Sequence, residues 1–243
     1  MSTRRDTLFA DPRERVAPFE FDANVVDVFD DMASRSIPLY TDLLDRCAEW
    51  VEQYARPDSV VLDIGCSTGR VFRLLRSRPL PANVRLYGVD SSPEMVQAAM
   101  QRLGDSPHDV RFEALRAEEM VLDAASVSVA LCNYTLQFVD PELRIPILQN
   151  IRQALHPGGF FVLSEKLTHA DPATAAFMIE HYHAYKRRAG YSDTEIQQKD
   201  TALQGVLRPW TLEQWQRAFA AAGFSEPVLA FRWLAFTTFV VRV

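Results

Sequence analysis

The segment Asp63-Ile64-Gly65-Cys66-Ser67-Thr68-Gly69 directly follows a short apolar run at 60–62. A glycine at the end of a buried strand lets the backbone approach a ligand, because no Cβ stands in the way. A dinucleotide fingerprint would have glycines at positions 65, 67 and 70, whereas this chain has Gly65, Ser67 and Arg70. The loop therefore predicts a ligand without a pyrophosphate, whose amino-acid end can hydrogen-bond to the loop amides.

Polar side chains also follow the next three predicted strands. Asp90 ends the second strand, twenty-one residues beyond Gly69, where a carboxylate can accept hydrogen bonds from both hydroxyls of a ribose. Glu118 and Glu119 follow the third strand, where an acid can accept from the exocyclic amine of adenine. Asn133 ends the fourth strand and places an amide at the mouth of the site. Together with the Asp63 loop, this set predicts S-adenosylmethionine (SAM) as the bound nucleoside.

Strand and helix patterns alternate through the first two thirds of the chain. Strands are predicted at 60–65, 84–90, 110–115, 127–133 and 160–164, the last of them after a turn at 156–159. Helices are predicted from their apolar spacing at 41–54, 71–78, 93–103 and 142–155. This alternation predicts a doubly wound, mostly parallel α/β sheet of the Rossmann-like type, in which ligands bind at the carboxyl ends of the strands.

The two ends of the chain depart from this alternation. Residues 1–40 mix proline with phenylalanine, which is too apolar for a disordered tail and predicts an ordered cap. Residues 168–208 carry helical patterns with no strand between them, so we interpret them as a helical insertion over the carboxyl edge of the sheet. A helix at 210–222 and a hairpin at 228–231 and 236–243 complete a single predicted domain, 1–243.

Composition limits the partners and the compartment. With 26 basic and 32 acidic residues the net charge is −6, and no cluster of Lys and Arg marks a track for nucleic acid, so a small-molecule substrate is favoured. The three cysteines, Cys47, Cys66 and Cys132, are far apart and predict neither a disulfide nor a metal site. No apolar segment is long enough for a membrane span or a secretion signal, so a cytoplasmic protein is expected.

The predicted insertion adds candidate reacting groups. His181 and His183 are two residues apart, which points them to different faces of a helix and predicts no metal site. Tyrosines, histidines and basic residues gather in this segment, which would roof the site. A roofed cavity favours an enzyme that shields its reaction from water over a domain that only senses SAM.

The chain resembles the carboxy-S-adenosylmethionine synthase family, a branch of the class I methyltransferase fold. The similarity extends nearly end to end, through Ser36-Ile37-Pro38-Leu39-Tyr40, Asp63-Ile64-Gly65-Cys66-Ser67, Thr135-Leu136-Gln137-Phe138 and Leu163-Ser164-Glu165-Lys166. The resemblance implies a homodimer, a sheet of seven strands with the last one antiparallel, and prephenate as the carboxyl donor for carboxy-SAM, which serves the modification of a tRNA wobble uridine. It also implies SAM contacts from Tyr40, Gly65, Cys66, Ser67, Asp90, Ser91, Glu118, Glu119 and Asn133.

One position departs from the family pattern. After Gln198 and Lys199 the family has an arginine that pairs with the carboxylate of the carboxylated product, and this chain has Asp200. The planar fork of arginine suits a carboxylate, whereas an aspartate would repel one. Lys199 and Arg208 are the candidates to replace the lost cation.

Three reactions then remain open at the predicted site. Methyl transfer to a small-molecule acceptor needs mainly alignment, with His181, His183 or Glu165 as a base, and is our first hypothesis. The second is carboxyl transfer from prephenate, and the third is ring closure of the amino-acid arm of SAM with release of methylthioadenosine. The product is accordingly S-adenosylhomocysteine or a SAM derivative. The candidate catalytic residues are Asn133, Tyr182, His183 and Asp200, the last of which could orient the ammonium group in ring closure.

Overall fold

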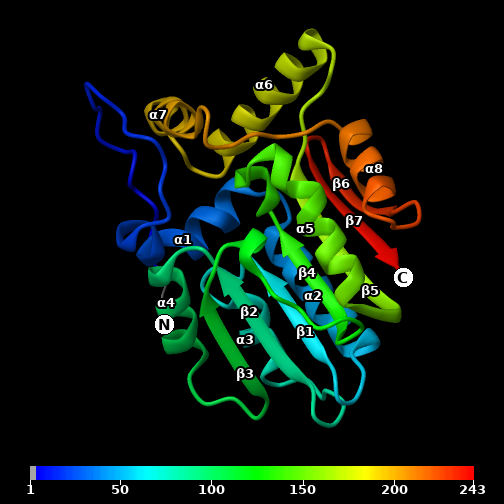
Figure 1. Ribbon diagram of the computed structural model, residues 1–243. Helices are drawn as coiled ribbons and strands as arrows, with labels where there is room; N and C mark the ends of the chain where they lie inside the picture. Colours follow the sequence, from blue (N-terminus) through cyan, green and yellow to red (C-terminus); the bar gives the residue numbers. More distant parts are fainter. Residues whose placement is uncertain (1–3) are drawn as a thin grey trace.

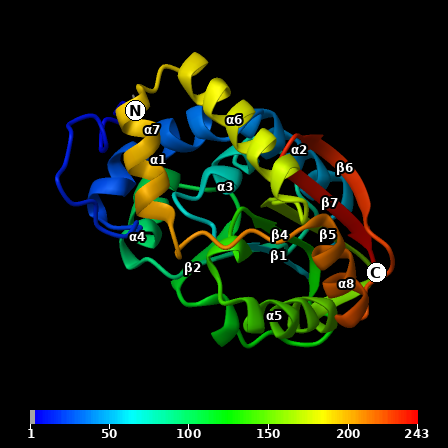
Figure 2. The ribbon, with the colours of Figure 1, turned by 90° about the horizontal axis from the view of Figure 1, so that it is seen from above.

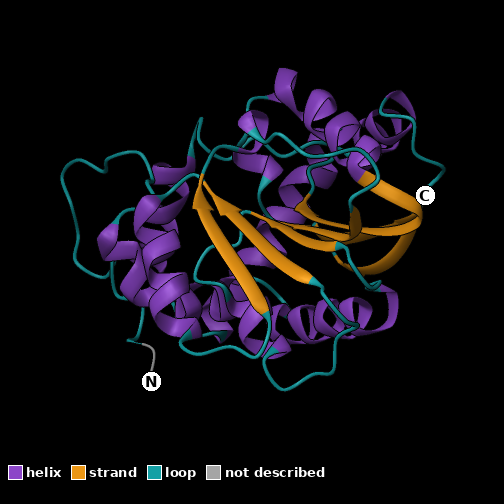
Figure 3. Cartoon of the chain, turned by 60° about the horizontal axis from the view of Figure 1, so that its bottom comes forward, coloured by secondary structure: helices purple, strands orange, loops and turns teal. Residues whose placement is uncertain are grey.

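Seven strands form one sheet in the order β3-β2-β1-β4-β5-β7-β6 (Figures 1 and 3). The computed structural model describes residues 4–243, so residues 1–3 of the predicted cap lie outside the described residues. The first five strands are parallel to one another, and β7 is antiparallel to β5 and β6. The predicted doubly wound, mostly parallel sheet is confirmed. The strands are β1 (Val60–Ile64), β2 (Arg85–Asp90), β3 (Asp109–Ala114), β4 (Val127–Asn133), β5 (Leu155–Lys166), β6 (Val228–Trp233) and β7 (Phe236–Arg242).

Alternate residues of the central strands enter two separate cores on the two faces of the sheet. In β1, Val61 belongs to one core, whereas Leu62 and Ile64 belong to the other. Helices cover both faces (Figure 3), which explains why β1 and β4 are mostly apolar on both sides. The core of Val61 includes α2 (Tyr40–Tyr54) and α3 (Arg70–Leu75), and the core of Leu62 includes α5 (Pro141–Ala154) and α8 (Leu212–Ala221).

Helices from distant parts of the chain lie beyond the carboxyl ends of the parallel strands. They are α1 (Ala23–Ser36), α6 (Pro172–Arg188) and α7 (Asp193–Leu203), as both ribbon views show (Figures 1 and 2). A third core joins α1 to α7 and to α4 (Pro93–Leu103) and includes Val26, Met95 and Ala202. Two short 3₁₀ helices, η1 (Ala117–Glu119) and η2 (Leu136–Phe138), follow β3 and β4. The edge of the sheet where this fold binds ligands is therefore covered.

Side-chain caps determine where two of these covering helices begin. The Asp22 carboxylate accepts the backbone N–H of Val25 ahead of α1. Ser192 and Glu195 form a capping box at the start of α7. Both caps satisfy backbone donors that would otherwise lack a partner at a helix N-terminus. No helix within residues 4–243 combines the length and the apolar composition of a membrane span.

The predicted turn at 156–159 is wrong, because these residues belong to β5. Leu155 already pairs with Val127 of β4, and the register shifts before Phe160 pairs with Val129. Gly158, at a φ of 76°, allows the bulge that accommodates the extra residues of β5. Glycine and proline therefore mark an irregularity inside this strand rather than its beginning.

The Asp30 carboxylate ties α1 to the elements beside it. It accepts a hydrogen bond from Thr68 Oγ1 at 2.6 Å and from Arg73 at 2.8 Å, and Arg102 lies 3.5 Å away. Burial opposes ionisation, but the contacts with Thr68 and the two arginines hold the pKa of Asp30 below its usual value. One acidic side chain thus connects the cap to α3, α4 and the loop after β1.

We expect Asp30→Ala to lower the free energy of unfolding by about 1–3 kcal/mol, because Arg73 and Arg102 would lose their shared carboxylate. Denaturant unfolding at neutral pH measures this change. Asp27→Ala, on the exposed side of the same helix, is the matched control and should change the value by less than about 0.5 kcal/mol. Equal effects of the two substitutions would show that Asp30 does not tie the cap to the sheet.

Candidate active site

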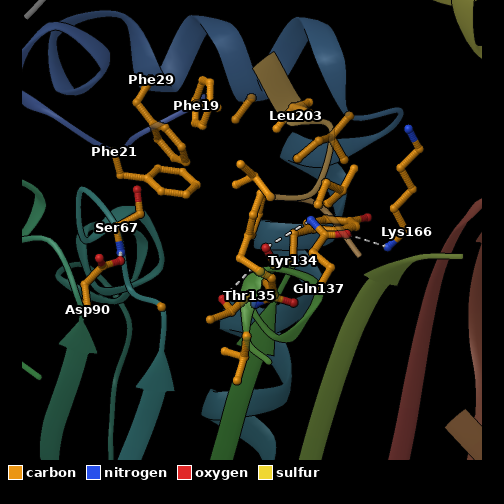
Figure 4. Close-up of a pocket in the computed structure, with 18 of the residues that line it drawn as sticks. Phe19, Phe21, Phe29, Ser67, Asp90, Tyr134, Thr135, Gln137, Lys166 and Leu203 are labelled. Atoms are coloured by element: carbon orange, nitrogen blue, oxygen red, sulfur yellow. Dashed lines mark hydrogen bonds between the residues drawn. The ribbon is translucent and has the colours of Figure 1, made fainter. Parts of the chain in front are cut away.

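A cavity of about 400 Å³ lies between the carboxyl ends of the strands and the helices α1, α6 and α7 (Figure 4). A smaller recess adjoins it and shares Tyr40, Gly65, Ser67 and Asn133 with it. Asp63 and Cys66 line the recess, whereas Glu119 and His183 line neither space. The predicted site residues that line the cavity are Tyr40, Gly65, Ser67, Asp90, Ser91, Glu118, Asn133, Tyr182 and Asp200.

Gly65 allows the loop after β1 to pass directly against the loop after β4. Its φ of 71° lies in the left-handed region, and a Cβ at this position would overlap the side chain of Thr135. The backbone N–H groups of Gly65 and Cys66 both donate to the carbonyl of Val89, at 2.8 and 2.9 Å. The loop is therefore fixed against β2, with its backbone facing the cavity.

Asp90 ends β2 and holds the same loop from the other side. Its Oδ2 accepts the Ser67 backbone N–H at 2.9 Å, and its Oδ1 accepts the Ser92 backbone N–H at 3.0 Å. Burial raises the pKa of Asp90, and the two hydrogen bonds oppose that rise. Each carboxylate oxygen keeps a free lone pair, so Asp90 can accept both hydroxyls of a ribose that enters the cavity.

The Asp63 carboxylate lies in the smaller recess, which Arg70 also lines without forming an ion pair with it. Burial raises the pKa of Asp63 to about 7, and the negative charge of Asp90 contributes to the rise. Residues 4–243 place no Lys, Arg or His within ion-pair distance of this carboxylate. A buried acid without a partner is unfavourable, so the recess fits an ammonium group such as that of the amino-acid part of SAM.

The two acids after β3 have different surroundings. Glu118 lines the cavity and pairs with Arg116, at 2.6 Å between Oε1 and Nε. Glu119 turns back and accepts the backbone N–H of Arg116 at 3.3 Å, which caps η1. Of the predicted pair, only Glu118 is therefore placed to meet an adenine.

Aromatic side chains of the cap close the cavity on the side of Asp90. Phe19, Phe21 and Phe29 line it, and the ring of Phe21 packs edge to face on Phe138 of η2, with 5.2 Å between centroids. Figure 4 shows these rings above Ser67 and Asp90. The sequence shows this group only as an apolar stretch, because its position over the site results from tertiary packing.

Three lysines also line the cavity, and the Nζ of one of them, Lys199, lies 5.8 Å from the centroid of the Phe19 ring. Lys166 ends β5, Lys186 belongs to α6 and Lys199 belongs to α7. Burial lowers the pKa of Lys166 to about 8 and that of Lys199 to about 7. The sequence-based site omits Lys166, although it ends a parallel strand as Asn133 does and the same rule would have found it.

Asp200 lines the cavity and has two partners in the insertion. His183 Nε2 lies 2.6 Å from its Oδ2, and Lys186 Nζ lies 3.8 Å from its Oδ1. His183 therefore reaches the site only through Asp200. Of the two candidates for a replacement cation, Lys199 lines the cavity, whereas Arg208 does not and lies 3.6 Å from Asp140.

Two of the expected general bases are not placed for that role. Glu165 is fully buried, its two oxygens accept the backbone N–H groups of Leu136 and Gln137 at 2.9 and 3.0 Å, and it lines neither space. Burial raises the pKa of Glu165 to about 8. His181 is exposed on α6, and its Nδ1 lies 3.0 Å from the carbonyl of Phe177. These positions correct the expectation that either side chain removes a proton from a substrate.

Comparison with known proteins places this fold and site in a class. A protein-family model described as a methyltransferase domain matches residues 61–159. An S-adenosylmethionine-dependent methyltransferase from Mesorhizobium loti aligns with a TM-score of 0.57 and 18% identity, over 82% of this chain and 100% of that one. The cyclopropane synthase MmaA2 from Mycobacterium tuberculosis aligns with a TM-score of 0.56 and 18% identity, over 93% of this chain and 71% of that one. The protein is a SAM-dependent transferase with the class I methyltransferase fold.

Similarity to curated sequences identifies the family within this class. The carboxy-S-adenosyl-L-methionine synthase of Pseudomonas aeruginosa is 40% identical over 97% of this chain and 97% of its own length. The enzyme of the same name from Chromohalobacter salexigens is 40% identical over 97% of this chain and 87% of its own length. The chain belongs to the carboxy-S-adenosyl-L-methionine synthase family.

We expect Gly65→Ala to weaken SAM binding at least about tenfold, because the new Cβ would force the loops after β1 and β4 apart. Isothermal titration with SAM measures the dissociation constant, and a thermal melt shows whether the variant is folded. Gly104→Ala is the control, since Gly104 also has a positive φ of 60° but has open space around it. If both variants bound SAM like the parent protein, the close approach at Gly65 would not shape the site.

Proposed function

We propose that this chain forms carboxy-SAM by transferring a carboxyl group from prephenate to the methyl carbon of SAM. The observation that carries the proposal is the group of three lysines that line the cavity. Lys166, Lys186 and Lys199 line the cavity together with Asp200, whose Oδ1 lies 3.8 Å from Lys186 Nζ. A donor carboxylate and a carboxylated product both need positive charge at this place. The names of the curated relatives agree with this reaction.

The transfer exchanges one carbon–carbon bond for another. The bond between the ring of prephenate and the carboxyl group breaks, and the carboxyl carbon forms a bond with the methyl carbon of SAM. The methyl carbon loses a proton, which leaves with the hydroxyl group of prephenate as water, and phenylpyruvate remains. SAM supplies the sulfonium whose positive charge makes that methyl proton removable.

Residues of the cavity and the recess have separate tasks in this proposal. Asp90 accepts hydrogen bonds from the ribose hydroxyls of SAM, and Asp63 accepts hydrogen bonds from its ammonium group. The methyl group of SAM is then directed toward the lysines. The Asn133 side chain is oriented by Ser164, whose hydroxyl donates to Asn133 Oδ1 at 2.8 Å. Burial raises the pKa of Tyr182, so its hydroxyl stays protonated at neutral pH and its ring serves as a support for the lysines.

Methyl transfer to a small-molecule acceptor is a second candidate, and the Asp200 carboxylate is the observation that favours it. A negative side chain in the cavity opposes the formation of a new carboxylate. It does not oppose an acceptor molecule that is neutral or that carries a positive charge away from its nucleophilic atom. Ring closure has less support. Asp200 lines the cavity but not the recess around Asp63, where the ammonium group of SAM fits best.

Mass spectrometry of the nucleosides formed from SAM, alone and with prephenate, tests the proposal. We expect carboxy-SAM only when prephenate is present, with phenylpyruvate in equal amount. S-adenosylhomocysteine formed only after addition of an acceptor library would favour methyl transfer instead. Methylthioadenosine released without an acceptor, above the spontaneous rate, would favour ring closure, and either result without carboxy-SAM would overturn the proposal.

A further inference from the structure

We infer that Lys166 binds the transferred carboxylate in this chain and that Asp200 is a positioning residue, which holds Lys186 and His183 and does not contact the substrate. The inference rests on the proposed function for the origin of that carboxylate. Binding of SAM and of carboxy-SAM can nevertheless be compared without any reaction. The inference about Lys166 and the proposed carboxyl transfer can therefore be refuted separately.

The position of the Lys166 ammonium group is the first observation. Lys166 ends β5, and Figure 4 shows it on the side of the cavity opposite Asp90. Its Nζ lies 4.2 Å from the centroid of the Tyr182 ring and 5.9 Å from that of Phe236. Aromatic faces stabilise a cation that has lost part of its water, but they leave its hydrogen-bond donors free. The ammonium group is therefore held in place and still able to bind an anion.

The other two lysines of the cavity already have carboxylate partners. Lys186 Nζ lies 3.8 Å from Asp200 Oδ1, and Lys199 Nζ lies 3.9 Å from Asp6 Oδ2. Asp6 is itself buried and accepts the hydroxyl of Tyr191 at 2.9 Å. Within residues 4–243, Lys166 is the lysine of the cavity that pairs with no carboxylate.

The contacts of Asp200 account for its presence in a site that is to receive an anion. Its two oxygens are engaged by His183 and Lys186, at 2.6 and 3.8 Å. The negative charge is thus shared with groups of α6, while Lys166 on β5 remains available. The aspartate lowers the positive charge of the site, but within the part of the chain that the structure describes it leaves the Lys166 ammonium group without a carboxylate at ion-pair distance.

The protonation of Lys166 gives the inference a pH dependence. The groups close to it are Tyr182 and Lys186 from α6, Asp200 from α7 and Phe236 from β7, and Lys199 of α7 lines the same cavity. Burial lowers its pKa to about 8, the Asp200 carboxylate opposes this shift and Lys186 adds to it. Because only the charged form attracts a carboxylate, the preference should be complete well below pH 8 and should decline as the pH rises through about 8.

The test is the ratio of dissociation constants for SAM and for chemically prepared carboxy-SAM, measured by isothermal titration from pH 6.5 to 9.5. Groups that contact the shared parts of the two ligands cancel in this ratio. We expect the parent protein to prefer carboxy-SAM at least about tenfold at pH 7, and Lys166→Met to remove that preference and its pH dependence while SAM binds as before. Asp200→Asn should increase the preference, because a negative charge is removed from the site.

Arg187→Met is the matched control, since Arg187 is a cation of α6 that pairs with Asp193 on the protein surface. It should leave the ratio unchanged at every pH. A preference that survives in Lys166→Met, or a parent protein with no preference, would overturn the inference. Asp200→Asn with a reduced preference would show that Asp200 contacts the ligand. A parent protein that prefers carboxy-SAM but never forms it would contradict the proposed function and leave the inference standing.

Discussion

The contact between the loops after β1 and β4 is the constraint on which the site depends. The strand order reverses between these two strands, so the loops that follow them separate around a crevice. They meet again at Gly65, where Thr135 Oγ1 donates to the carbonyl of Ile64 at 3.1 Å and fills the space that a Cβ would need. This contact closes the bottom of the crevice. Asp90 and Asn133, on either side of it, can therefore bind the same ligand.

The buried acid Glu165 supports the loop after β4 and, through that loop, the position of Lys166. Glu165 accepts the backbone N–H groups of Leu136 and Gln137, which fixes the turn after β4. The side-chain carbonyl of Gln137 in turn accepts the backbone N–H of Lys166 at 3.0 Å. The position of Lys166 thus depends on a buried acid, Glu165, that lines neither the cavity nor the recess. Glu165 therefore precedes Lys166 in β5 without adding a negative charge to the cavity lining.

Sequence reasoning found those parts of the fold and site that depend on local patterns. The end of β2 at Asp90 and the end of β4 at Asn133 are visible because strands leave a clear apolar pattern and ligands bind where they end. Hydrogen bonds made by a side chain leave no such pattern. Glu119 caps η1 and Glu165 holds a turn, yet in sequence both look like acids available to a substrate. The roles of Phe19 and Phe21 were hidden for the same reason, since their contacts come from tertiary packing.

The charge around Lys166 shows most clearly what a local sequence pattern cannot reveal. Asp200 replaces the positive charge expected at this position with a negative one. Taken alone, this substitution predicts that the site repels carboxylates. The potential at the methyl group is, however, a sum over β5, α6 and α7, which lie far apart in the chain and contribute Lys166, Lys186 and Lys199. In the proposal made above, the aspartate pairs with Lys186 and leaves Lys166 free to bind a carboxylate, which would be a change in specificity rather than a loss of the site. Which lysine pairs with Asp200 follows from contacts between α6 and α7, which only the folded structure brings together.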